Sequence, residues 1–267
     1  MRLTLTKHHG LGNDFLVLFD DQPVPARGIA ALTVELCERR RGVGADGLIL
    51  AVTAPPDGSD VGMVLHNADG SRAEMSGNGI RCLVQAWAHR AGRREGTVKV
   101  ATDAGVRAVD FGPGGDDRTI FASVAMGAAD AIAAPPGWDA LGVDRARPVA
   151  HLSLGNPHAV VAVEDVDGVD LGLLGAQVPD VNLEIVEPGP ERHAVTMRVH
   201  ERGAGITEAC GTGACAAAFA AARWGLATPR DGEITVHMVG GDAKVRLGPE
   251  LVLTGPATYI ATVEVPT

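Results

Sequence analysis

Two segments of the chain, far apart in the sequence, repeat one short pattern. Each has a glutamate, any residue, a small side chain ending in a hydroxyl or thiol, and then Gly-x-Gly before a helix-forming run; the first contains Glu74 and Ser76, the second Glu208 and Cys210. The runs predict that Ser76 and Cys210 each lie at a helix N-cap. Helix N-termini favour a thiolate and can hold a carboxylate. Cys210 is therefore a candidate base, although a buried cysteine can also be a simple small hydrophobe.

A second pair of segments extends this repeat. Residues 12–17 read Gly-Asn-Asp and then three apolar residues, and residues 155–160 read Gly-Asn-Pro-His and then apolar residues. The two pairs keep their order but not their separation, as expected of two halves with different loops. We therefore predict an α/β (α+β) fold with two pseudo-symmetric halves, residues 1–125 and 126–256, and expect a last strand, residues 257–267, to complete the first half.

Composition excludes several classes of protein. The chain has 267 residues, 46% of them hydrophobic, which is enough for two small domains. A formal net charge of -10 argues against a nucleic-acid-binding surface. The 4 cysteines form no CxxC pair, which favours reduced thiols in the cytoplasm over a disulfide scaffold. We find neither a secretory signal nor an apolar run of membrane-spanning length, and expect no membrane partner.

One basic run has a structural explanation. Apolar residues recur at helical spacing over residues 29–41, and Gly42 follows as a helix stop. We expect this helix to end in Arg39–Arg41, because cations stabilise a helix C-terminus.

Several polar residues at turns and strand ends have an ordinary structural interpretation beside a functional one. Asn13 and Asn67 lie in turns, where asparagine often only satisfies backbone groups. His158 lies between two apolar strands, where a lone histidine is more often a core residue than a catalyst. Glu201 and Arg202 end a strand, and such an adjacent pair is most often exposed charge.

The sequence lacks the usual cofactor motifs. It contains no Walker loop, no Gly-x-Gly-x-x-Gly after a strand, no HExxH and no Cys/His cluster, so we predict neither a metal nor a cofactor. The lysines, Lys7, Lys99 and Lys244, lie in no motif that suggests a Schiff base with pyridoxal phosphate. Two acid/base groups at facing helix N-termini suit the removal of a proton from one face of an amino-acid α-carbon and its return to the other face.

The motifs together resemble the diaminopimelate epimerase family, over nearly the whole chain and in the family's order. The segments that carry the resemblance are His9–Phe15, Asn67–Ser71, Gly77–Cys82, Gly155–His158, Glu201–Gly205 and Ala209–Cys215. The resemblance implies two similar halves, each a curved, mostly antiparallel sheet around a central helix, with the active site in the cleft between them and a homodimer as the assembly.

The resemblance also implies a reaction and a set of roles. The reaction is the interconversion of L,L- and meso-diaminopimelate by two-base α-proton transfer without pyridoxal phosphate, in lysine and peptidoglycan precursor biosynthesis. Cys210 and the residue at position 76 would be the catalytic pair; His158 and Glu201 would tune it, and Glu201 would also bind the reacting ammonium. The non-reacting end of the substrate would be held by Asn13, Asn67, Asn156, Asn182 and Arg202. The reacting carboxylate would be held by backbone N–H groups of Gly77, Asn78, Gly211 and Thr212.

One departure from the family pattern concerns the chemistry itself. The family has a cysteine at both helix N-termini, and this chain has Ser76 at the first; Cys82 lies inside the helix and does not replace it. A serine hydroxyl is a poor general base compared with a cysteine thiol, but as a proton donor it is less disadvantaged. Three explanations stay open: an engineered change, a natural serine or a water it holds that exchanges the second proton, or a chain that has drifted to another reaction. The alternatives to the epimerase are thus a racemase or isomerase of another amino acid and a catalytically silent binding homologue.

Overall fold

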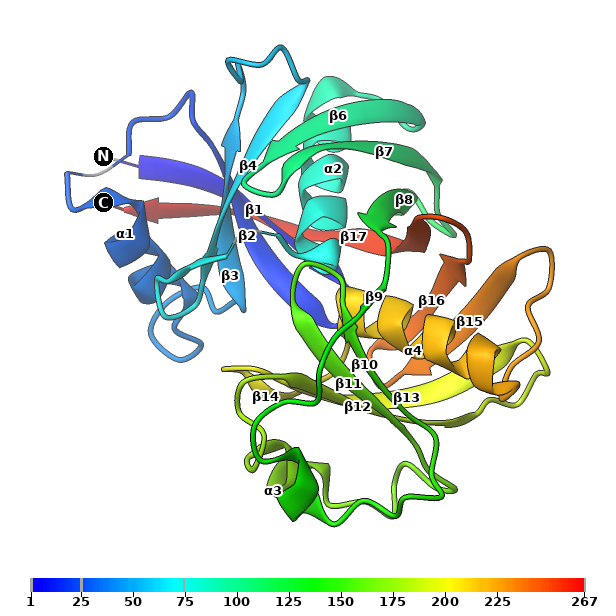
Figure 1. Cartoon of the computed structure of the whole chain (residues 1–267). Coiled ribbons are helices and arrows are strands. Elements are labelled where there is room, and N and C mark those ends of the chain that lie inside the picture. Colours follow the sequence, from blue (N-terminus) through cyan, green and yellow to red (C-terminus); the bar gives the residue numbers. More distant parts are fainter. Residues whose placement is uncertain (1, 25, 74, 267) are drawn as a thin grey trace. The chain divides into compact units, whose positions relative to one another are not determined.

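The computed structural model describes residues 2–24, 26–73 and 75–266, and it divides the chain into two compact units. Unit 1 comprises Met1–Val124 and Gly255–Thr267, and unit 2 comprises Ala125–Thr254. The last strand, β17 (Leu251–Pro266), thus begins in unit 2 and ends in unit 1. Figure 1 labels most of the helices and strands of both units.

Unit 1 is a curved sheet around one helix. Its strands are β1 (Arg2–Gly10), β2 (Asn13–Phe19), β3 (Gly47–Val52), β4 (Val61–Asn67), β5 (Arg72–Ala73), β6 (Gly96–Thr102), β7 (Gly105–Pro113) and β8 (Thr119–Gly127), and its helices are α1 (Gly28–Cys37) and α2 (Gly77–Ala91). The pairs β2–β3 and β4–β6 are parallel, while β1–β2, β3–β4, β6–β7, β7–β8 and β1–β17 are antiparallel. Because β17 also pairs with β8, the sheet closes on itself, and α2 packs against β1, β2, β3, β4 and β7.

Unit 2 repeats this plan. Its elements are β9 (Asp130–Ala131), a 3-10 helix (Trp138–Leu141), β10 (Val149–Ser153), β11 (Pro157–Ala162), α3 (Leu171–Gly175), β12 (Asn182–Pro188), β13 (Ala194–Glu201), β14 (Gly205–Thr207), α4 (Gly211–Trp224), β15 (Glu233–Met238), β16 (Gly241–Arg246) and the start of β17. The parallel pairs β11–β12 and β13–β15 match β2–β3 and β4–β6 of unit 1. Helix α4 packs against β10, β11, β12, β13, β15 and β16, so each unit has one central helix, which confirms the predicted fold class.

Local sequence explains where the two central helices begin and end. Ser76 and Cys210 are their N-cap residues, and Gly92 and Gly225 are their left-handed C-caps with φ of 64° and 74°. Glycine adopts this conformation without the steric cost that a Cβ atom brings. The alanines of α4 are almost all buried, and their small side chains allow close approach of the surrounding strands.

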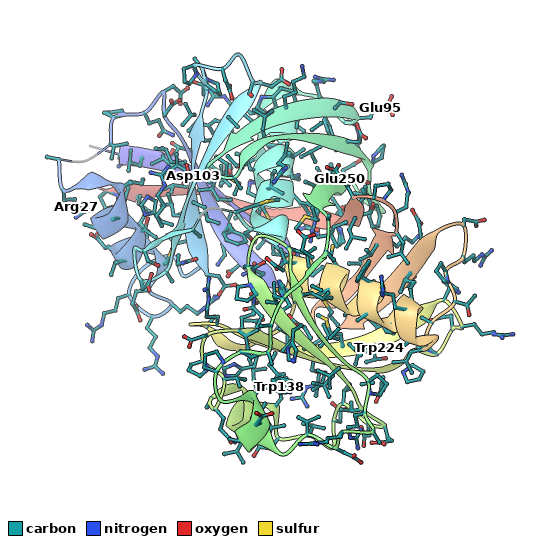
Figure 2. All side chains as sticks on the ribbon, viewed as in Figure 1. Arg27, Glu95, Asp103, Trp138, Trp224 and Glu250 are labelled. Atoms are coloured by element: carbon teal, nitrogen blue, oxygen red, sulfur yellow. The ribbon has the colours of Figure 1, made fainter. Side chains whose placement is uncertain are left out.

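The shorter helices α1 and α3 each pack against part of the sheet of their own unit. In unit 1, Leu32 and Leu36 of α1 pack against a cluster that includes Leu5, Leu16 and Leu48. In unit 2, Leu171 of α3 packs in a cluster that includes Leu183 and Ile185 of β12, and Trp138 packs against the same cluster beside α3 (Figure 2). Each unit therefore has a second apolar cluster beside a shorter helix, whereas strands such as β6 and β16 alternate buried and exposed residues and leave one face to solvent.

The prediction for the end of the first helix was wrong. Helix α1 ends at Cys37, because Glu38 has extended backbone angles of φ -60° and ψ 123°. The basic run therefore does not stabilise a helix C-terminus, and Arg39 instead contacts the carboxylates of Asp14 and Asp46. In the part of the chain that the structure describes, no helix combines the length and apolar character needed to cross a bilayer.

Candidate active site

The two repeated motifs have the same backbone geometry at their central residue. Ser76 has φ -139° and ψ 126°, and its Oγ accepts a hydrogen bond from Gly79 N at 3.0 Å. Cys210 has φ -125° and ψ 119°, and its Sγ accepts one from Gly213 N at 3.3 Å. The side chain of each N-cap residue thus lies at the positive end of its helix dipole, as the sequence predicts. Glu74, the first residue of the first motif, lies outside the described residues.

The environment of Cys210 opposes ionisation. Burial, and then the negative charges of Glu201 and Glu184, raise the pKa of the Cys210 thiol well above its ordinary value, although Thr212 and Gly213 act in the other direction. The Thr212 hydroxyl lies 3.5 Å from Cys210 Sγ and can donate to it. The thiol is therefore protonated at neutral pH until a cation or a lost negative charge lowers its pKa.

A buried polar group lies beside Cys210 in the same unit. His158 and Glu184 are both fully buried, and His158 Nδ1 lies 2.7 Å from Glu184 Oε1. The other ring nitrogen, Nε2, lies 3.0 Å from Asn156 Oδ1, and Asn156 Nδ2 donates to Thr212 Oγ1 at 3.3 Å. The structure therefore joins His158, Asn156 and Thr212, three residues that the sequence predicts for the site, to the cysteine at the start of α4.

The turn between β13 and β14 brings the predicted charged pair to the same unit. Asn182 Oδ1 accepts from Arg202 N at 2.8 Å, so this asparagine fixes the backbone of the turn while Arg202 itself is exposed. Glu201 accepts a hydrogen bond from the Thr207 hydroxyl at the other side of the turn. Of the two residues of this pair, Glu201 is the one whose charge raises the pKa of the Cys210 thiol.

Around Ser76, unit 1 has its own network. Asn78 Nδ2 donates to Asn13 Oδ1 at 3.2 Å, and Asn78 Oδ1 accepts from Arg81 Nη2 at 2.6 Å. Arg81 is fully buried and also donates to Gly77 O at 3.0 Å and to Pro256 O at 3.4 Å. The guanidinium thereby ties the first turn of α2 to β17, and it fixes the amide of Asn78.

The β1–β2 turn is held by a second group of charges. Asp14 contacts Arg39 Nη2 at 2.8 Å and Lys7 Nζ at 2.9 Å, and Asp46 accepts from Asn13 Nδ2 at 2.7 Å. Burial of Asp14 favours its protonated form, but hydrogen bonds and charges from Arg39 and Lys7 outweigh this and lower the pKa of its carboxyl. The orientation of Asn13 therefore depends on these ion pairs.

We expect Asp14→Asn to lower the free energy of unfolding by about 3 kcal/mol near neutral pH, since it removes the buried carboxylate that Lys7 and Arg39 share and leaves Arg39 with Asp46 alone. A carboxyl whose pKa is lowered by folding contributes stability above its unfolded pKa, about 3.9, and that contribution disappears as pH falls through the folded value. Urea titrations at decreasing pH should thus show the two proteins converging. Asp103→Asn, which removes a more exposed pair with Arg72, should cost less than about 1 kcal/mol, and an equal cost for both changes would contradict this account.

The remaining predicted residues have these positions. Asn67 ends β4 and is exposed, and its Nδ2 donates to Ser71 Oγ at 3.0 Å. Asn67 pairs with Gly47 on β3. Gly47 in turn pairs with Phe15 on β2, two residues after Asn13. Gly77 and Gly211 are the first residues of α2 and α4 and are buried. Among the described residues there is no cluster of three or more His, Cys, Asp or Glu side chains that could hold a metal ion.

Sequence reasoning missed Glu184, Arg81 and the Asp14–Asp46 pair. Glu184 had a usable signal: it is the only charged residue in the otherwise apolar run from Leu183 to Val186, and strand alternation puts it on the same face as Asn182. A buried charge on a strand must find a partner, which here is His158. Arg81 offered no such signal, because an arginine in a helix is usually exposed.

The chain is similar to known proteins over nearly its whole length. A sequence model of the family described as "Diaminopimelate epimerase" matches residues 5–132 and 151–260. The diaminopimelate epimerase of Synechococcus elongatus is 36% identical over 292 residues, covering 97% of each chain. That of Streptomyces coelicolor is 39% identical over 286 residues, covering 97% of this chain and 94% of the relative. Among solved structures, a phenazine biosynthesis protein of the PhzF family from Bacillus anthracis has a TM-score of 0.77 at 14% identity, with 100% of both chains covered, which is a likeness of fold.

Proposed function

Because this chain belongs to the diaminopimelate epimerase family and is therefore an isomerase, we propose that it interconverts L,L- and meso-diaminopimelate without pyridoxal phosphate. The observation that carries the proposal is the matched geometry of Ser76 and Cys210, each at the N-cap of a central helix with a backbone N–H bonded to its reactive atom. The proposed place of the reaction is the synthesis of lysine and peptidoglycan precursors.

In the proposed reaction, one proton is removed from the α-carbon and another is added to its opposite face. Cys210, as a thiolate, takes the α-proton, and the electrons of the broken C–H bond delocalise into the α-carboxylate. N–H groups at the helix starts stabilise that developing charge, which is electrostatic preorganisation of the oxyanion-hole kind. Ser76, or a water it holds, delivers a proton to the opposite face of the carbon. Exchange with solvent then restores the proton on oxygen and removes the proton from sulfur.

Substrate binding should prepare the thiol for this role. Glu201 is proposed to hold the ammonium group of the substrate, and a neutralised Glu201 would no longer raise the pKa of Cys210 by its charge. Asn13, Asn67, Asn156, Asn182 and Arg202 are proposed to hold the distal end. The ionised form of Cys210 would thus become favourable only with the substrate in place, which protects the free enzyme from unwanted reactions of a thiolate.

Exchange in heavy water tests this function. The enzyme is incubated separately with each isomer. In one isomer the α-proton faces Cys210, and in the other it faces Ser76. Deuterium should enter the first isomer about tenfold or more faster than the second, because serine is the weaker base. NMR spectroscopy of the recovered amino acid measures both rates. Equal rates would show that Ser76 is a competent base. Lysine, which lacks the distal carboxylate, is the matched substrate control and should exchange far more slowly.

Ser76 also supports one other candidate, a homologue that binds diaminopimelate without turning it over. The same experiment separates the two, because binding without any solvent exchange at the α-carbon would support the silent homologue and overturn the epimerase. A racemase of a different amino acid would instead exchange that amino acid faster than diaminopimelate in competition.

Assembly as a homodimer and a cytoplasmic location also stay proposals. We expect the mass in solution to be about twice that of the 27.5 kDa chain, and light scattering after size-exclusion chromatography measures it. A monomer that is fully active would contradict the dimer.

A further inference from the structure

The proposed ammonium-binding residue, Glu201, and the proposed base, Cys210, lie at the two ends of one short segment of unit 2. Strand β13 ends at Glu201, β14 returns beside it, and α4 starts directly after Cys210. Gly203 and Gly205 have left-handed φ angles of 78° and 79°, which glycine adopts without a steric cost, so the chain reverses in a tight turn. The carboxylate and the thiol are therefore carried by parts of the chain that fold back on each other.

Thr207 lies on the returning strand and faces the same side of the hairpin as Glu201. Thr207 pairs with Val199, and Glu201 pairs with Gly205. Because side chains two residues apart on a strand point to one face, Thr207 lies diagonally across the ladder from Glu201, within reach of its long side chain. Thr207 Oγ1 donates to Glu201 Oε1 at 2.5 Å, a distance typical of a hydroxyl that donates to a carboxylate.

The backbone on both sides of this hydrogen bond is anchored. Directly after Thr207, Glu208 O accepts from Gly240 N at 2.9 Å, in the turn between β15 and β16. On the other side of the hairpin, Asn182 Oδ1 accepts from the backbone of the turn at 2.8 Å. With both strands held in this way, the hydrogen bond from Thr207 fixes what remains variable, the rotation of the partly exposed carboxylate side chain at the end of β13.

The position of this carboxylate affects the thiol. The titratable groups around Cys210 are Glu201 at the end of β13, Glu184 on β12, and His158 on β11, which contacts Glu184. The charges of both carboxylates raise the pKa of the thiol. Glu184 is fully buried and cannot turn toward water, whereas Glu201 is partly exposed. The hydrogen bond from Thr207 therefore keeps Glu201 beside the thiol when water would otherwise attract the carboxylate away.

We propose that Thr207 is a positioning residue, which holds the Glu201 carboxylate between the Cys210 thiol and the ammonium group of the substrate. The proposal rests on the proposed function only in giving Glu201 an ammonium group to bind. Loss of the hydroxyl should have two effects of different kinds. The amino acid should bind more weakly, and the thiol of the ligand-free protein should ionise at lower pH, because a released Glu201 turns toward solvent.

Alkylation of Cys210 by iodoacetamide, followed over a range of pH by tandem mass spectrometry and without substrate, tests the second effect. Thr207→Val should move the midpoint to lower pH, so that alkylation below the midpoint is about threefold faster. Glu201→Gln, which removes the charge itself, should make it about tenfold faster, and in that background Thr207→Val should change the rate by less than about 1.5-fold. A general loss of packing would instead raise the height of the profile without moving its midpoint.

The controls separate the hydroxyl from the rest of the side chain. Thr207→Ser keeps the hydroxyl and should reproduce the wild-type midpoint, and so should Thr196→Val, which removes a hydroxyl elsewhere on β13. If valine prevents folding, Thr207→Ala removes the same hydroxyl and should give the same shift as expected for valine. An unchanged midpoint in a folded variant without the hydroxyl overturns the proposal, and so does a shift of equal size in the Glu201→Gln background.

Isothermal titration calorimetry with diaminopimelate tests the first effect. Thr207→Val should weaken binding about tenfold, because a hydrogen bond to a charged group is lost, and Thr207→Ser should weaken it less than about twofold. In the Glu201→Gln background, Thr207→Val should cause no further loss; an undiminished loss there would overturn the proposal. If the wild type binds no diaminopimelate, the proposed function fails, whereas the alkylation profile still decides whether Thr207 holds Glu201 beside the thiol.

Discussion

Changing Ser76 to cysteine should raise the rate of diaminopimelate epimerisation by about 10²-fold, since a positioned general acid or base contributes roughly 10²- to 10⁴-fold. The N-cap position already supplies what a thiolate needs: a backbone N–H from Gly79 at 3.0 Å from the side-chain oxygen, and the positive end of α2. Serine keeps the geometry but ionises far less readily than cysteine. Chiral chromatography of the L,L and meso isomers over time measures the rate.

The controls for this gain concern where the thiol is placed. Ser59→Cys adds a thiol in the loop between β3 and β4 and should leave the rate unchanged. In heavy water, Ser76→Cys should also bring the two isomers toward equal rates of deuterium exchange. If the rate of epimerisation stays the same, the serine is not the limiting group, and another reaction becomes the better explanation of the site.

Gly213→Ala should lower kcat by about 10²-fold, which is the usual effect of a displacement of about 1 Å at a catalytic group. A methyl group at position 213 would lie 2.7 Å from Glu184 Oε1, and 3.2 Å and 3.3 Å from Cβ and Sγ of Cys210. Glu184 cannot move away easily, because it is fully buried and bonded to His158. Alanine is otherwise the better helix former, so α4 itself should persist. Steady-state kinetics and circular dichroism of the variant measure the two effects.

The equivalent change in the other motif provides a matched comparison. A methyl group on Gly79 would lie 3.1 Å from Ser76 Cβ and 3.4 Å from its Oγ, with no contact under 3.0 Å. Gly79→Ala should therefore reduce kcat several-fold less than Gly213→Ala. Equal losses would mean that the buried carboxylate beneath α4 is not the source of the effect.

The sequence predicted the helix starts well, because the signals there are local. A small polar or thiol side chain, two glycines and a run of helix formers determine an N-cap within a few residues, and both Ser76 and Cys210 are N-caps in the structure. The two-half α/β fold followed from the repeat of these signals. In contrast, the sequence did not predict that α1 ends at Cys37, where Val43 N and Gly44 N bond to Leu36 O. The basic run then places Arg39 beside Asp14 and Asp46, which are neighbours only once β2 and β3 pair.

The hydrogen-bonded group of Glu184, His158 and Asn156 beside Cys210 could not be predicted, for the same physical reason. His158 and Glu184 are 26 positions apart in the sequence, and they meet because β11 and β12 pair in parallel with His158 opposite Asn182. From residue type alone, a buried histidine or glutamate could have bonded to many other polar side chains. Only the register of β11 against β12 decides that His158 meets the carboxyl group of Glu184.

The course of β17 has a consequence for any attempt to take the protein apart. This strand pairs with β16 through Val252–Thr254 and with β1 through Thr258–Pro266, so its two ends serve different units. A gene fragment that stops at residue 124 would produce β1 and β8 with unpaired edges, and such edges invite aggregation. We expect each half to be insoluble when it is expressed alone. Co-expression of the two halves should restore the complete fold. Cleavage of the intact protein in an exposed loop should leave that fold in place.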